Sequence, residues 1–131
     1  MYTEFIMETV GSTLKGVSEV KDSAKASICI IHGIGEHMGR YDHVIRKLSD
    51  AGYNVFIYDL PGHGKSEGKR GHCGSSDELM ETVDTLIAHA KRIAPEKPIF
   101  VMGHSMGGNI ALAHRFYRQS ADVLGYISSS P

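Results

Sequence analysis

The 131 residues suffice for one domain with a hydrophobic core, and 41% of them are hydrophobic, as in soluble globular proteins. The 14 Lys and Arg against 15 Asp and Glu leave a net charge of −1, which excludes strong electrostatic attraction to nucleic acid or anionic membranes. Because the chain shows neither an apolar stretch of the roughly 20 residues that span a bilayer nor a signal-peptide pattern, we expect a cytoplasmic protein. Cys29, in an apolar run, and Cys73, in a glycine-rich segment, are expected to be free thiols.

The first predicted elements are strands. Residues 3–9 and 14–20 alternate loosely in polarity around Gly11-Ser12, which predicts an N-terminal hairpin. Four later runs are rich in β-forming residues without strict alternation, a pattern typical of parallel strands that are covered on both faces. These runs are residues 27–32, 54–59, 99–102 and 123–127.

Helical patterns separate the later strands. They cover residues 41–48, 79–93 and 106–118. Gly52 marks the end of the first, and Ser75 with Glu78 predicts a capping box before the second. Alternating strands and helices predict an α/β fold, with a mostly parallel sheet and helices on both faces. Residues 1–131 form one domain, or part of one.

A Gly-x-Ser-x-Gly motif lies between the predicted strand that starts at residue 99 and the third helix. Ser105 is its serine, and Gly103 and Gly107 are its glycines. In a nucleophile elbow the serine takes a strained backbone conformation, and larger side chains two positions away would collide across the turn. The alternative is a glycine-rich turn whose serine only caps the helix. The context of strand and helix favours Ser105 as a catalytic nucleophile.

The segment after the first parallel strand has the composition of an oxyanion loop. It reads Ile31-His32-Gly33-Ile34-Gly35-Glu36-His37. Acyl transfer needs two backbone N–H donors, one from the residue after the nucleophile and one from this loop. Met106 and Ile34 are the candidates, and Gly33 lets the backbone approach the substrate. A flexible glycine turn is the alternative, which the Ser105 motif disfavours. The spacing of His32 and His37 matches no metal motif, so we expect no metal and no cofactor.

Gly64-Lys65-Ser66 resembles the end of a phosphate-binding P-loop. The first glycine of that motif would fall at position 59, which is Asp59, and further glycines keep the chain irregular to about residue 75. A dinucleotide fingerprint fails as well, because Glu67 stands where its third glycine belongs. The segment is therefore interpreted as a structural turn, and nucleotide binding is excluded.

Three motifs together resemble one branch of the α/β-hydrolase superfamily, the monoacylglycerol lipase and lysophospholipase group, often labelled serine aminopeptidase-like. They are His32-Gly33-x-Gly35-Glu36-His37 with Arg40-Tyr41, Asp59-x-x-Gly62-His63-Gly64, and Gly103-His104-Ser105-Met106-Gly107-Gly108. The resemblance implies that Ser105 is the nucleophile and that the N–H groups of Ile34 and Met106 form the oxyanion hole. It assigns supporting positions to His32, Gly33, Gly103, His104 and Gly107.

The resemblance also implies what this sequence lacks. Members of the group continue with a helical cap, two further strands and then the catalytic Asp and His, whereas these residues end at Pro131. We therefore expect the N-terminal part of one α/β-hydrolase domain, truncated after about the sixth strand, with neither catalytic Asp nor catalytic His. Five histidines could in principle substitute as the base, but their positions disfavour each of them: His32, His37, His63, His104 and His114.

The expected reaction is cleavage of a carboxylic ester through an acyl-Ser105 intermediate. By resemblance, the substrate is a lipid ester such as a monoacylglycerol or lysophospholipid, and the missing cap would make any transient contact with a membrane surface. A peptidase or thioesterase of the same fold, or a non-catalytic fragment, are the alternatives. No nucleic-acid partner is expected.

Overall fold

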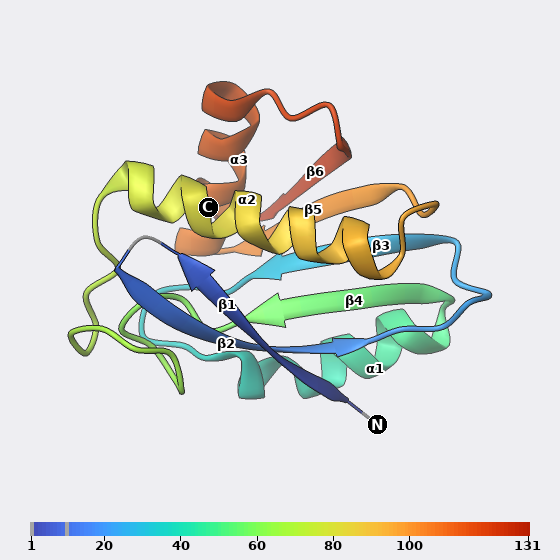
Figure 1. The fold of residues 1–131 in the computed structure, drawn as a ribbon, viewed down its shortest axis with the longest axis horizontal. Coiled ribbons are helices and arrows are strands. Elements are labelled where there is room, and N and C mark those ends of the chain that lie inside the picture. Colours follow the sequence, from blue (N-terminus) through green and yellow to red (C-terminus); the bar gives the residue numbers. More distant parts are fainter. Residues whose placement is uncertain (1, 10) are drawn as a thin grey trace.

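A six-stranded sheet organises the computed structural model, which describes residues 2–9 and 11–131 (Figure 1). The strand order is β1-β2-β4-β3-β5-β6. The β1–β2 and β2–β4 pairs are antiparallel, whereas β3 pairs in parallel with β4 and β5, and β5 with β6. The strands are β1 (Thr3–Thr9), β2 (Ser12–Glu19), β3 (Ala26–Ile31), β4 (Tyr53–Tyr58), β5 (Ile99–His104) and β6 (Val123–Ser129). The predicted hairpin and mostly parallel sheet are confirmed, with strand ends shifted by one or two residues.

Helices cover both faces of the sheet, as the sequence predicts. A 3-10 turn, η1 (Met38–Tyr41), leads into α1 (Asp42–Asp50) on one face, and α2 (Ser76–Ile93) and α3 (Met106–Arg118) lie on the other (Figure 1). Gly52, with φ +97°, follows the end of α1, where its conformation suits a glycine.

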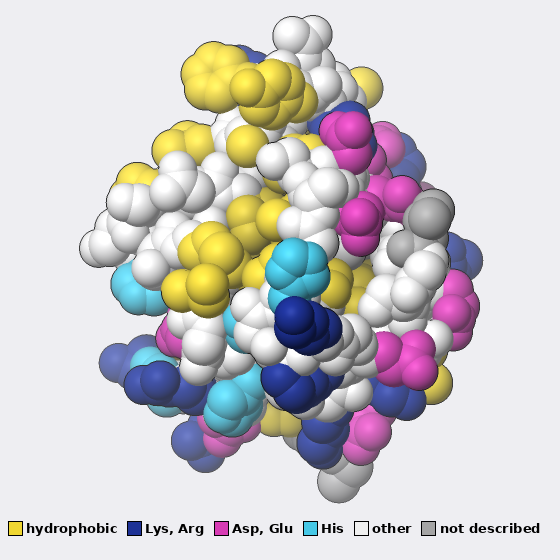
Figure 2. Space-filling view, turned by 90° about the vertical axis from the view of Figure 1, so that its left-hand side faces the viewer, with side chains coloured by type: hydrophobic (Ala, Val, Ile, Leu, Met, Phe, Trp, Pro, Cys, Tyr) yellow, Lys and Arg dark blue, Asp and Glu magenta, His cyan; other side chains and the backbone are white. Residues whose placement is uncertain are grey.

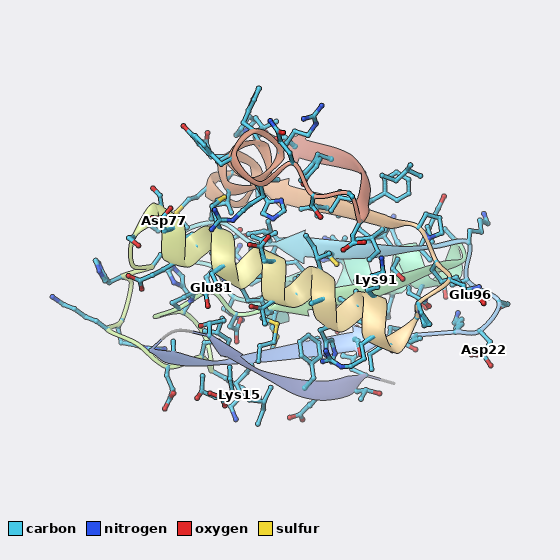
Figure 3. All side chains as sticks on the ribbon, turned by 45° about the horizontal axis from the view of Figure 1, so that its top comes forward. Lys15, Asp22, Asp77, Glu81, Lys91 and Glu96 are labelled. Carbon is cyan, nitrogen blue, oxygen red and sulfur yellow. The ribbon has the colours of Figure 1, made fainter. Side chains whose placement is uncertain are left out.

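Ser75 caps the start of α2, as predicted, although Glu78 accepts from the Ser75 hydroxyl and not, as in a capping box, from the Ser75 backbone N–H. The Ser75 hydroxyl oxygen accepts the Glu78 N–H at 3.2 Å and donates to the Glu78 carboxylate at 3.2 Å. Acidic side chains near the start of α2, including Asp77, and basic ones near its end, including Lys91, suit the helix dipole (Figure 3).

Alternating side chains of the central strands supply two hydrophobic layers. On β3, Ile28 and Ile30 face α1, while Cys29 and Ile31 face the core beneath α2 and α3. This explains the unbroken apolar run in the sequence, because both faces of the strand are covered. Cys29 is fully buried, and burial raises its thiol pKa to about 12. Cys73 is half-buried, and both cysteines are free.

The sheet ends at β6 on the side that α3 covers incompletely. Ile110 of α3 is buried, but several large apolar side chains of α3 and β6 are exposed. Leu112 and Phe116, one turn apart on α3, and Leu124 of β6 are among them, and we call these three residues the α3–β6 apolar surface. In the part of the chain that the structure describes, no helix has the length and apolar character of a membrane span.

Candidate active site

Ser105 occupies a sharp turn between β5 and α3. Its backbone angles, φ +56° and ψ −123°, lie in a region that non-glycine residues rarely adopt. The side chain makes no hydrogen bond that would cap α3. A serine that only capped the helix would have an extended backbone and such a hydrogen bond. The strained geometry predicted for a nucleophile elbow is therefore present, and the capping alternative is wrong.

The two glycines of the motif are required by backbone contacts. A Cβ atom on Gly103 would lie 2.0 Å from the carbonyl oxygen of Gly107, and one on Gly107 would lie 2.1 Å from that of Ile31. Backbone atoms at these distances cannot move aside as the end of a flexible side chain can. The elbow thus closes on itself and against the end of β3, which brings Ser105 beside the loop that follows β3.

The loop after β3 places the backbone of Gly33 against Ser105. A Cβ atom on Gly33 would lie 3.1 Å from the Cβ atom of Ser105. The Gly33 N–H donates to the Glu36 carboxylate at 2.7 Å, and the Gly35 N–H donates to Nε2 of His63 at 3.0 Å. Between them, the Ile34 N–H forms no hydrogen bond with another described residue, and the Ile34 side chain is exposed.

Met106 supplies the second candidate donor. It is the first residue of α3, so its N–H has no partner within the helix, and the helix dipole favours negative charge at this end. The structure thus brings together Ser105, Met106 and the loop that carries Ile34, as the sequence predicts. Two N–H groups near a serine hydroxyl suit an oxyanion that develops when that hydroxyl attacks a carbonyl carbon.

The turn after β4 is built around Asp59. Its carboxylate accepts the Met38 N–H at 2.7 Å and the Lys65 N–H at 2.9 Å, and Gly64 packs on the carboxyl group. After β4, the next helix begins only at Ser76. The interpretation as a structural turn is therefore confirmed, and the turn holds η1 beside the loop that follows β3.

None of the hydrogen bonds that the eight histidines form within residues 2–9 and 11–131 reaches Ser105. His104 points to the α1 side of the sheet, where its Nδ1 lies 3.2 Å from the Ser129 hydroxyl. His114 is buried and bonded to Asp84 and Tyr126. His63 uses both ring nitrogens, because Nδ1 also contacts the Pro61 carbonyl at 3.0 Å. In the structure, the hydrogen bonds of His63, His104 and His114 all go to groups other than Ser105.

The charges of the site are set by burial and hydrogen bonds. Burial lowers the pKa of His32, which keeps its ring neutral at neutral pH. Burial alone would raise the pKa of Glu36, but hydrogen bonds from the Gly33 N–H and the Tyr41 hydroxyl lower it below its usual range. Glu36 is therefore an ionised acceptor in the loop that follows β3. Among the residues that the structure describes, no group of three or more His, Cys, Asp or Glu side chains could hold a metal ion.

One hollow borders the elbow, and a second lies further along α3. One, of about 340 Å³, lies on the α1 side and includes Glu36, Tyr41 and His104; the other, of about 470 Å³, lies between α2 and α3. Figure 2 looks onto the edge where the parallel strands end, and hydrophobic side chains occupy its middle and upper parts. Lys, Arg and His side chains gather in its lower part. Asp and Glu side chains lie along its right-hand side and also in its lower part, so this face has apolar areas and charged areas of both signs.

The strand order and the strained serine turn define the class of protein as an α/β-hydrolase. Residues 22–131 match the model of the family described as "Serine aminopeptidase, S33", and the chain belongs to that family.

Known relatives agree with this assignment. The chain is 39% identical over 110 residues to phospholipase YtpA of Bacillus subtilis, covering 84% of this chain and 42% of the relative. It is 42% identical over 87 residues to a monoacylglycerol lipase of Mycolicibacterium smegmatis, covering 66% and 31%. The crystal structure of a monoacylglycerol lipase from Paleococcus ferrophilus superposes with a TM-score of 0.73 and 32% identity, covering 100% of this chain and 43% of that one. The chain spans less than half of each of these proteins.

Proposed function

We propose that these residues supply the nucleophile and the oxyanion hole of a serine hydrolase that cleaves carboxylic esters of single-chain lipids. The observation that carries the proposal is the strained backbone of Ser105, whose side chain does not cap α3 and which lies beside the loop that holds Ile34. The names of the relatives, a phospholipase and monoacylglycerol lipases, support a lipid ester as substrate.

In the proposed reaction the Ser105 hydroxyl oxygen attacks the ester carbonyl carbon. The carbonyl oxygen takes up the negative charge, and the N–H groups of Ile34 and Met106 donate to it. Collapse of this intermediate expels the alcohol and leaves an acyl group on Ser105, which water then hydrolyses to the free acid. A base must remove the Ser105 proton and return it to the alcohol. We place that base outside residues 1–131, since no histidine here is bonded to Ser105.

The test is the Ser105→Ala variant, prepared at the full length at which the natural source produces the protein. We expect loss of labelling by a fluorophosphonate and a fall in kcat for monoacylglycerol hydrolysis of at least about 10³-fold. Ser23→Ala, which changes an exposed serine in the turn between β2 and β3, is the matched control and should keep both. Labelling of Ser105→Ala at the wild-type rate would remove Ser105 from the mechanism. Parallel assays with an aminoacyl anilide decide between ester and peptide: faster turnover of the anilide would replace the lipid ester in this proposal.

A further inference from the structure

The ring of His32 is held in one tautomer by two backbone groups. Its Nε2 lies 3.0 Å from the Leu60 nitrogen, which can only donate, so Nε2 must accept. Its Nδ1 lies 2.7 Å from the Gly33 carbonyl oxygen, which can only accept, so Nδ1 must carry the proton. The ring is completely buried, and burial lowers its pKa. His32 is therefore neutral, with its proton on Nδ1.

This proton determines where the Ile34 N–H points. The Gly33 carbonyl and the Ile34 N–H belong to the same peptide group, which is planar and trans, so they point in opposite directions. The His32 Nδ1–H at 2.7 Å and the Glu36 N–H at 3.3 Å both hold the Gly33 carbonyl. Fixing the carbonyl on one side consequently fixes the Ile34 N–H on the other, away from the group of residues that holds the loop.

The loop needs this constraint because it contains two glycines. Gly35 has φ +71°, and glycines permit a peptide group to rotate at little steric cost. Rotation of the Gly33–Ile34 peptide would replace the donor by a carbonyl oxygen, whose partial negative charge would repel an oxyanion. The peptide groups on either side are held as well, because Glu36 accepts the Gly33 N–H and His63 accepts the Gly35 N–H.

We infer that His32 is a positioning residue of the proposed hydrolase: its Nδ1–H holds the Gly33 carbonyl and so aims the Ile34 N–H at the oxyanion. This inference rests on the proposed function. A purely structural role would instead use His32 only to fill its buried site and to tie the end of β4 through Leu60.

Two substitutions separate these roles. His32→Asn keeps an N–H donor close to the position of Nδ1, whereas His32→Gln places its amide near Nε2, where it can accept from Leu60 but not donate to Gly33. We expect His32→Gln to lower kcat by about 10- to 100-fold with little change in KM, less than the 10²–10³-fold that loss of a whole donor costs. His32→Asn should retain several-fold more kcat than His32→Gln, even where its melting temperature is the lower of the two.

The outcomes distinguish this inference from the proposed function. Turnover by Ser105→Ala would overturn the proposed function itself. An inactive Ser105→Ala with His32→Gln at the wild-type kcat, or with both His32 variants reduced equally, would overturn only the positioning role. If neither variant folds, nitrogen-15 NMR of the wild-type imidazoles decides: a proton on Nδ1 and none on Nε2 at neutral pH supports the inference, and any other state of the His32 ring contradicts it.

Discussion

The loops at the carboxyl edge of the sheet have their polar groups hydrogen-bonded, whereas the α3–β6 apolar surface leaves its hydrophobic side chains exposed. In the loops, Asp59, His32, Glu36 and His63 each bind backbone N–H groups. No buried side-chain nitrogen or oxygen of the described residues lacks a hydrogen-bond partner. On the α3–β6 apolar surface, by contrast, Phe116 and Leu124 are each 70% exposed. We call Asp59, His32, Glu36 and His63 the polar scaffold of the site; their hydrogen-bond partners all lie within the described residues. The α3–β6 apolar surface, in contrast, has no cover within these residues.

Disrupting the turn at Ser105 should have the largest effect on the free energy of unfolding, because this turn connects the loops at the sheet edge to α3. Gly107→Ala puts a methyl group against the Ile31 carbonyl oxygen and should cost several kcal/mol, a large part of the 5–15 kcal/mol of a typical domain. Gly71→Ala is the matched control, since Gly71 has φ +78° but open space around it, and it should cost only about 1–2 kcal/mol. Thermal melting of both variants checks this. Equal melting temperatures for the two would contradict the steric argument.

The α3–β6 apolar surface should control self-association. β6 is an edge strand, and exposed apolar edges favour pairing between chains. We expect residues 1–131 to self-associate and the double variant Phe116→Lys with Leu124→Lys to shift them toward monomer. The free energy of unfolding should change by about 0.5 kcal/mol or less per site, because both side chains are exposed. Ala88→Lys, on the exposed side of α2, is the control for added charge. A monomeric wild type in analytical ultracentrifugation would contradict the expectation.

The sequence predicted the elements and the elbow because both leave local signals. Periodicity marks the strands and helices, and the Gly-x-Ser-x-Gly motif is a contiguous run of residues, although Gly107 packs against Ile31 of distant β3. The polar scaffold left no such signal. Glu36, His63 and Asp59 act on backbone N–H groups, and His63 and Gly35 lie 28 positions apart. The family motifs contain these residues, but only the fold shows which amide each one holds. The exposure of Phe116 and Leu124 likewise depends on which strand ends the sheet.

The smallest of these effects is a dependence of stability on pH. Burial holds the pKa of His32 below its ordinary 6.5, so the unfolded chain binds a proton that the folded chain does not. The free energy of unfolding should therefore fall as the pH drops below about 6.5. Burial and nearby Arg92 act on the pKa of His89 in the same direction. The lowered pKa of Glu36 adds a second loss at lower pH, because its stabilisation exists above the ordinary 4.5 and disappears through its folded pKa.

Urea unfolding at several pH values measures this dependence. His32→Gln should flatten the slope between neutral pH and the onset of Glu36 protonation. An unchanged slope in His32→Gln would assign the effect to other groups.

The two cysteines allow two kinds of opening of the molecule to be measured by their reaction with a thiol reagent. Cys29 sits at the centre of β3 with its thiol fully enclosed, so a thiol reagent reaches it only when the sheet itself separates. Cys73 lies half-buried in the loop before α2, where a local movement of the loop is enough. The rate at Cys29 therefore follows global unfolding and the rate at Cys73 follows loop opening. Thiol labelling of one wild-type sample thus gives the rates of both processes without an introduced cysteine.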